Sequence, residues 1–194
     1  MKKHIFVIGL NDFNRARLQS IEPRDSYEFY PLLERSRLVN VDTFPMGQLL
    51  SDAEQQLESF EGTVDGVIGY MDFPVSTILP VLWQRFGLRG ASLESVLKCE
   101  HKYWSRLEQR RVIPDHIPRF QEFDPFDDDA LQQITLEYPF WVKPVKSCGA
   151  FLGFRIHNAR EFHRAIDAIR ENIGRYGAPF EYLLDCVDLP DEVA

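Results

Sequence analysis

The chain has 194 residues, of which 44% are apolar and 27% are charged, and its formal net charge is −8. This composition is typical of a globular protein with a sizeable core, and the acidic balance argues against binding to a nucleic-acid backbone or to an anionic membrane surface. Three cysteines without metal-ligand or disulfide spacing indicate reduced thiols and a cytoplasmic location. The apolar run that begins at Ile5 is too short for a secretory signal or a membrane span, and we expect it to form a buried strand.

The first half of the chain alternates strand-like and helix-like segments. Short runs rich in β-branched or aromatic residues predict strands, and apolar residues at helical spacing predict helices between them. The expected strands cover residues 4–10, 27–33, 66–70 and 89–92, and the expected helices cover residues 13–21, 46–60 and 74–86. Strands that alternate with helices favour parallel pairing through right-handed crossovers. We therefore expect an α/β domain over residues 1–92 with an open, doubly wound parallel sheet.

A second, smaller domain of the α+β class is expected over residues 93–194. Its predicted elements are a long helix over 93–112, an extended segment over 117–123, a short helix over 127–134, two strands within 138–157, a helix over 159–176 and a tail from 183 without regular structure. We interpret the carboxylates of Asp127, Asp128 and Asp129 as caps of the short helix, with a metal site as the alternative. No residue is assigned as a metal ligand.

The most informative stretch is the loop after the first of the two late strands. Lys143 lies near the end of that strand, and Lys146, Ser147, Cys148 and Gly149 follow. Backbone N–H groups in such a loop, with a lysine at its base, suit the oxygens of a phosphate. The alternative is an ordinary surface hairpin whose lysines are solvated.

A series of short motifs, taken in order, resembles a known family. The motifs are Phe-Gly-Leu-Arg-Gly-Ala-Ser before the long helix, His101-Lys102 within it, Ile113-Pro and Ile117-Pro-Arg-Phe after it, and Tyr-Pro-Phe-Trp-Val-Lys-Pro around Lys143. Their order is similar to the N-terminal portion of ATP-grasp ligases, as in the carboxylate–amine ligases and the relatives of biotin carboxylase. The resemblance implies a preliminary α/β domain followed by the first subdomain of the ATP-grasp fold.

The resemblance also implies a nucleotide site. Lys102 and Lys143 would reach the phosphates of ATP, and Lys146, Ser147 and Gly149 would belong to a flexible loop that closes over them. ATP and magnesium are the implied cofactors of the intact parent protein. In this family a carboxylate attacks the γ-phosphate of ATP, and a nucleophile, often an amine, then captures the acyl phosphate. The implied partner is therefore a small-molecule carboxylate substrate.

The strand end at Asn11 and Asp12 resembles part of the family's substrate-facing surface, which makes these two residues candidate substrate contacts. The same turn lacks the three-glycine dinucleotide fingerprint, which argues against NAD. The alternative function is a non-catalytic α/β binding or interaction module whose lysines are surface residues.

The chain also departs from the family pattern. Cys148 stands where a small residue is expected, and we interpret it as a tolerated small residue rather than a nucleophile. The family's adenine hinge and its acidic and Asn ligands for magnesium have no counterpart before Ala194. We therefore expect a fragment that is inactive alone, has no assigned catalytic residue, binds ATP weakly or not at all by itself, and binds no magnesium by itself. Apolar surface around Phe151, Phe154 and the Leu183-Leu184 tail is expected to be exposed and to cause self-association or a disordered tail.

Overall fold

The central strand of the first sheet is β1 (Lys3–Ile8), and both of its neighbours run parallel to it. In the computed structural model, which describes residues 2–193, β2 (Tyr27–Leu32) pairs with one edge of β1 and β3 (Gly66–Ile68) pairs with the other. The register places Ile5 opposite Phe29 on one side and opposite Gly66 on the other. The order β2-β1-β3 confirms the expected parallel α/β sheet.

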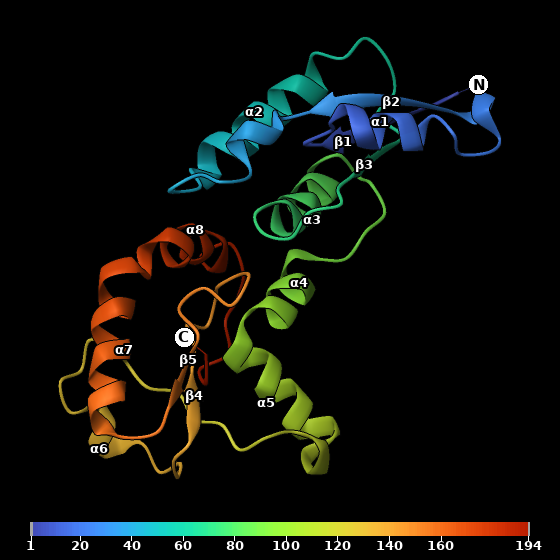
Figure 1. Ribbon diagram of the computed structural model, residues 1–194. Coiled ribbons are helices and arrows are strands. Elements are labelled where there is room, and N and C mark those ends of the chain that lie inside the picture. Colours follow the sequence, from blue (N-terminus) through green and yellow to red (C-terminus); the bar gives the residue numbers. More distant parts are fainter. Residues whose placement is uncertain (1, 194) are drawn as a thin grey trace. The chain divides into compact units, whose positions relative to one another are not determined.

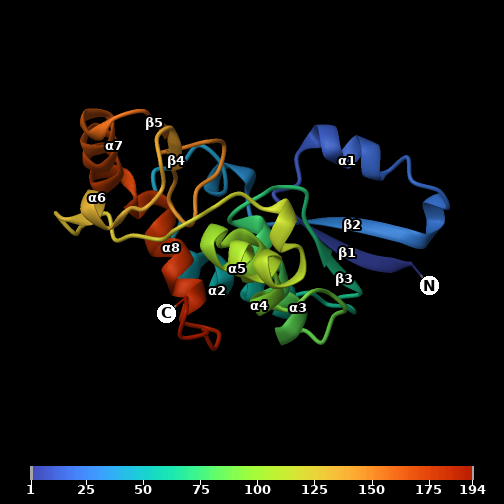
Figure 2. The ribbon, with the colours of Figure 1, turned by 90° about the horizontal axis from the view of Figure 1, so that it is seen from below.

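The helices α1 (Asp12–Leu18), α2 (Met46–Glu58) and α3 (Val75–Arg85) accompany this sheet. The crossovers from β1 to β2 and from β2 to β3 run in opposite directions, so right-handed connections place α1 and α2 on opposite faces. Figures 1 and 2 show α3 on the same side as α2. Each of α2 and α3 buries a broad apolar stripe, whereas none of the seven described residues of α1 is buried. Single turns of 3-10 helix, η1 (Arg24–Ser26) and η2 (Arg35–Arg37), flank β2.

Residues 89–92 do not form the fourth strand that the sequence predicts. They lie in the loop between α3 and the next helix, and all of their side chains are exposed. The segment Arg-Gly-Ala-Ser contains no large apolar side chain, so burial against a sheet would stabilise it little. The expectation of a strand at this position was wrong.

The chain divides into two compact units, Met1–Val96 and Leu97–Ala194. The second unit begins within α4 (Leu93–Glu100), which is followed by α5 (Lys102–Val112) and the 3-10 turn η3 (Pro114–His116). The sequence predicts one helix over 93–112, and the break at His101 corrects that prediction. The backbone N–H of Lys102 donates to the carbonyl oxygen of Val145 at 2.9 Å, outside the helix, while the His101 imidazole caps the first turn of α5.

A two-stranded antiparallel sheet, β4 (Phe140–Val142) with β5 (Phe154–Ile156), forms the centre of the second unit. The short helix α6 (Ala130–Gln133) precedes it, and α7 (Ala159–Asn172), capped by Asn158, follows it. Helix α7 covers one face of the sheet, with α5 on the other side (Figure 1). The core of this unit is a cluster of buried side chains at Ala130, Phe140, Val142, Ile156, Phe162, Ala165, Ile166 and Ile169.

The end of the chain is more regular than the sequence predicts. After a junction at Ile173 the chain continues as α8 (Gly174–Leu184), so residues 183 and 184 belong to a helix rather than to an irregular tail. Leu183 is 0% exposed, and Phe151 and Phe154 are half-buried. The expected exposure of Leu183 was therefore wrong, because α8 turns this side chain into the protein interior.

Candidate nucleotide site

The second unit contains a cavity of about 770 Å³. Its wall comes from the end of α4, the first two turns of α5, the extended segment 118–125, residues 136–145 around β4, and the end of α7. Cationic groups and aromatic rings share this wall. The cationic residues are Lys102, Arg106, Arg119 and Lys143, and the aromatic residues include Tyr103, Phe120 and Trp141. Such a wall combines positive charge for an anion with flat apolar surfaces for a ring.

Lys143 and Trp141 share the outward face of the β4 segment. Phe140 and Val142 alternate with them and are buried in the core, as the two-residue period of a strand requires. Trp141 is 61% exposed, and Nζ of Lys143 lies 5.3 Å from the centroid of the Trp141 indole. The candidate site residues inferred from the sequence do not include Trp141. The alternation of side chains along β4 could have identified it, because a residue two positions before Lys143 lies on the same face of the strand.

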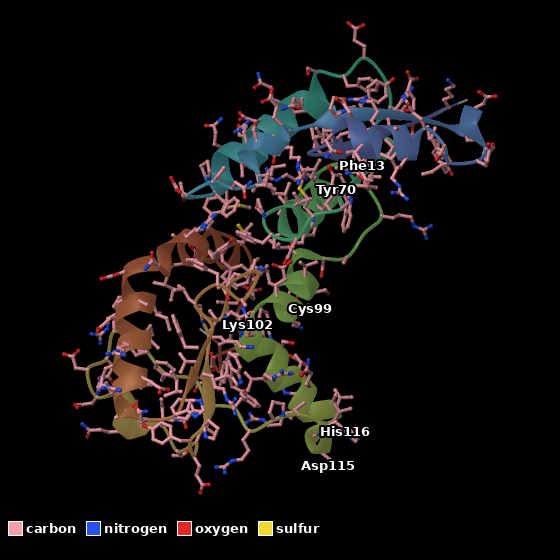
Figure 3. All side chains as sticks on the ribbon, viewed as in Figure 1. Phe13, Tyr70, Cys99, Lys102, Asp115 and His116 are labelled. Carbon is pink, nitrogen blue, oxygen red and sulfur yellow. The ribbon has the colours of Figure 1, made fainter. Side chains whose placement is uncertain are left out.

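Lys102 lies at the start of α5, three residues after Cys99 of α4 and beyond the break at His101 (Figure 3). Its Nζ donates to the backbone oxygen and to Oγ of Ser147, each at 3.2 Å. Lys102 and Lys143 therefore line one cavity, and Ser147 contacts the first of them. The role of these three residues in binding phosphate stays a prediction.

Lys146 occupies a different position. Its side chain is 4% exposed and forms an ion pair with Glu100, at the end of α4. The cavity wall formed by the described residues includes neither Lys146 nor Gly149. Gly149 lies in the exposed part of the loop with a φ of 58°, and Ala150 follows it with a φ of 61°. Phosphate contacts of Lys146 and Gly149 likewise stay predictions.

Asn11 and Asp12 belong to the first unit, where they follow the carboxyl end of β1. The Asn11 Oδ1 accepts hydrogen bonds from the backbone N–H and the side-chain amide of Asn14, both at 2.9 Å. Asn11 is thus the N-cap of α1, and Asp12 is exposed in its first turn. A substrate contact of either residue stays a prediction.

Carboxylates also reach the cavity, at Glu122 and Glu137. Partial burial and the charge of Glu192 raise the pKa of Glu122 above its ordinary value. Across residues 2–193, no group of three or more His, Cys, Asp and Glu side chains is placed to hold a metal ion. The expectation that the aspartates at 127–129 cap α6 was wrong, because the N-cap residue Asp129 makes no capping hydrogen bond with its side chain. Asp127 accepts the backbone N–H of Asp129 at 2.8 Å in the turn before the helix.

Comparison with solved structures finds a likeness to the crystal structure of L-amino acid ligase from Bacillus licheniformis. The likeness has a TM-score of 0.58 at 18% sequence identity, and it covers 87% of this chain and 42% of the ligase chain. The fold is ATP-grasp-like. This chain thus spans less than half the length of the ligase that it resembles. No protein-family model and no curated protein matches the chain.

An ATP-grasp-like fold agrees with a parallel sheet followed by a small antiparallel sheet, and it does not by itself assign a ligand to the cavity. Within the part of the chain that the structure describes, no helix combines the length and apolar character needed to cross a bilayer. The proposed function therefore depends on the charged and aromatic residues that line the cavity.

Proposed function

We propose that this chain is the N-terminal, nucleotide-binding portion of an ATP-dependent ligase that joins a carboxylate to an amine through an acyl phosphate. The observation that carries the proposal is the position of Lys102 and Lys143 on the wall of one cavity, with the exposed indole of Trp141 beside them. The ATP-grasp-like fold and the likeness to an amino acid ligase support it. The first unit would be the preliminary domain, and the second the incomplete ATP-grasp subdomain.

The residues on the wall fit a nucleoside triphosphate. Lysine ammonium groups bind phosphate oxygens as point charges, and the net effect of Lys102 and Lys143 is to compensate the negative charge of the phosphate chain. The exposed ring of Trp141 offers a stacking surface for a base, and Phe120 contributes a second ring to the wall. When bound, ATP would supply the phosphoryl group that activates the carboxylate. The two lysines would stabilise the charge that develops as this group moves.

Magnesium fits less well. It needs oxygen ligands in a near-octahedral array, commonly one or two carboxylates together with phosphate oxygens. Glu122 and Glu137 line the cavity, but the residues that the structure describes form no cluster that would hold the ion alone. We assign no step to magnesium in this chain and expect its ligands in the remainder of the parent enzyme.

Several further expectations are part of the proposal. Ser147 and Gly149 would belong to a loop over the phosphates, and Asn11 and Asp12 would contact the carboxylate substrate. The parent enzyme would act in the cytoplasm, and this chain would self-associate and would have little activity alone.

The test is a comparison of Mg-ATP, ADP and inorganic tripolyphosphate binding by equilibrium dialysis at millimolar concentration. We expect weak binding of ATP and of tripolyphosphate by the unmodified chain, since solvent-exposed charge contacts each contribute about 0–1 kcal/mol. Lys143→Met should reduce both affinities, and Lys2→Met, which removes an exposed lysine outside the cavity, should change neither. Equal affinities in the three proteins would support a non-catalytic interaction module instead.

A further inference from the structure

The ion pair between Lys146 and Glu100 is unusual because both side chains are shielded from water. The side chain of Lys146 is 4% exposed and that of Glu100 is 13% exposed. Nζ of Lys146 also lies 5.5 Å from the centroid of the Phe180 ring, on α8. A charge in such surroundings is tolerated only with its partner, and removal of one member of a buried pair is strongly destabilising.

The residues before and after Lys146 also form hydrogen bonds, with the chain that follows Glu100. The backbone N–H of Lys102 donates to the carbonyl oxygen of Val145, and Nζ of Lys102 donates to Ser147. The chain before and after Lys146 is thus attached to the chain that follows Glu100. Between the two partners, His101 is buried and stacks on Phe180, with ring centroids 6.1 Å apart.

These contacts link the pair to the cavity. Lys102 lines the cavity wall, and the acceptors for its ammonium group belong to Ser147, the residue next to Lys146. The position of Ser147 therefore depends on where Lys146 is held. Because the charge of Lys146 is compensated by Glu100, the pair contributes no net charge to the cavity.

From this arrangement we infer that Lys146 is a positioning residue and not a phosphate ligand. Its ion pair with Glu100 fixes the start of the 146–153 loop against the α4–α5 junction and so holds the ammonium group of Lys102 beside Ser147. The inference rests on the proposed function for the part that Lys102 plays in binding a nucleotide. The attachment of the loop itself is independent of any ligand.

A phosphate-binding role and a positioning role of Lys146 predict different results when Lys146 and Glu100 are substituted together. If Lys146 binds phosphate, its loss lowers phosphate affinity whatever residue stands at 100. If Lys146 positions the loop, the single variants Lys146→Met and Glu100→Gln leave one buried charge without its partner, whereas the double variant removes both charges and relieves that penalty. Methionine and glutamine keep the approximate size of the side chains that they replace.

The experiment measures the acetylation rate of individual lysines with N-hydroxysuccinimidyl acetate, by mass spectrometry, in the 194-residue chain. Lys143 is the internal reference because it is exposed and lies in the same cavity. Each single variant should raise the rate of Lys102 relative to Lys143 about tenfold, as the loop detaches and the hydrogen bonds to Ser147 open. The double variant should return the ratio to within about threefold of the unmodified chain. Asp128→Asn, which breaks an exposed ion pair with Arg170, should not change it.

Amide hydrogen exchange of residues 146–153 supplies a second measurement, since the N–H groups of Phe151 and Gly153 donate to carbonyl oxygens within the loop. Faster exchange in the single variants and recovery in the double variant are expected. Should Lys146→Met fail to fold, Glu100→Gln and the double variant still give the comparison. An unchanged Lys102-to-Lys143 ratio in Glu100→Gln, or a double variant that stays as altered as Lys146→Met, would overturn the inference.

Tripolyphosphate binding separates this inference from the proposed function. If the Lys102-to-Lys143 reactivity ratio and the tripolyphosphate affinity of the double variant both return to the values of the unmodified chain, the inference and the proposed function are both supported. Recovery of reactivity in a chain that binds no tripolyphosphate would keep Lys146 as the residue that positions the loop and would remove the nucleotide site. Affinity that stays lost in the double variant although reactivity recovers would make Lys146 a phosphate ligand.

Discussion

The imidazole Nδ1 of His101 accepts the backbone N–H of Trp104 at 3.0 Å, so a histidine serves as the N-cap of α5. An imidazole that accepts at Nδ1 carries its proton on Nε2 and is neutral. Burial, assisted by the nearby charge of Lys102, lowers the pKa of His101 to about 4 from an ordinary value of 6.5. The start of α5, and with it Lys102, therefore depends on a histidine that stays uncharged.

This depressed pKa predicts how stability changes with pH. Between pH 6.5 and about 4 the unfolded chain binds a proton at His101 that the folded chain does not. The free energy of unfolding should therefore fall as the pH falls through this window, and His101 contributes at most about 1.4 kcal/mol per pH unit to this fall. Above pH 6.5, His101 should no longer contribute to the pH dependence of the free energy of unfolding. Urea unfolding at pH 7.5, 6.5, 5.5 and 5.0 measures the effect.

His101→Asn is the matched control for this prediction. Asparagine keeps an oxygen that caps the helix but does not titrate, so the part of the slope between pH 6.5 and 5.0 that belongs to His101 should disappear. A slope that is the same in both proteins would show that His101 does not titrate in this way.

The exposed position of Trp141 predicts a fluorescence response to ATP. The chain has three tryptophans, of which Trp104 is buried and Trp83 is half-buried, so acrylamide should quench Trp141 preferentially. ATP should protect this fluorescence, whereas tripolyphosphate, which has no base, should not. Trp141→Leu should weaken ATP binding by about 1–3 kcal/mol, the usual contribution of a base stacked on an aromatic ring, and should leave tripolyphosphate binding unchanged. Protection by both ligands would mean that the base does not stack on Trp141.

Helix α8 offers a test of the correction at the end of the chain. Leu183 is 0% exposed and Tyr182, its neighbour, is 45% exposed. Leu183→Ala should lower the free energy of unfolding by about 2–5 kcal/mol, because it removes buried methyl groups and leaves a cavity. Tyr182→Ala should change it by less than about 1 kcal/mol, as surface substitutions usually do. Equal effects of the two substitutions in urea unfolding would contradict the buried position of Leu183.

The elements that the sequence predicts well are those stabilised by their own pattern. The strand β1 and the helices α2 and α7 each carry an apolar pattern with the correct period, and each forms close to its expected position. The break at His101 is different, since the acceptor that diverts the N–H of Lys102 is the carbonyl oxygen of Val145, far along the chain. Neither helical propensity nor periodicity contains that contact.

The same distinction applies to the site. Of the site residues that the family resemblance implies, Lys102 and Lys143 line the wall of one cavity, and their contact with phosphate stays a prediction. The burial of Lys146 was not expected, because its partner Glu100 precedes it by 46 residues and a lysine in a loop is ordinarily solvated. A pattern of residue types indicates which groups are available, and only the packing of α4, α5 and α8 decides which of them face the cavity.

The backbone of the loop makes a further prediction. Gly149 has a φ of 58°, and a Cβ built on it would meet no atom within 4 Å. Gly149→Ala should therefore lower the free energy of unfolding by about 1 kcal/mol, through backbone strain alone. Gly174→Ala is the control, since Gly174 also has open space around it but begins helix α8 and has no positive φ, so alanine should raise stability by roughly 0.5 kcal/mol. The same sign for both substitutions would contradict the left-handed conformation of Gly149.

The last prediction concerns the activity of a longer protein that contains this chain. If Lys143 compensates the charge on the transferring phosphoryl group, Lys143→Met should lower the rate of ATP-dependent ligation about a hundredfold, equivalent to about 3 kcal/mol of transition-state stabilisation. Folding should change little, because Lys143 is exposed and methionine keeps most of the apolar stem of the lysine side chain.

The measurement is the release of phosphate from ATP in the presence of a carboxylate and an amine, on a chain extended past Ala194. Lys2→Met in the same extended chain controls for the loss of an exposed positive charge, and a thermal unfolding curve for each variant separates a loss of function from a loss of structure. A fall in kcat with a nearly unchanged KM would show that Lys143 stabilises the transition state. Equal rates in the unmodified protein and in Lys143→Met would remove Lys143 from the site, and with it the main support for a ligase.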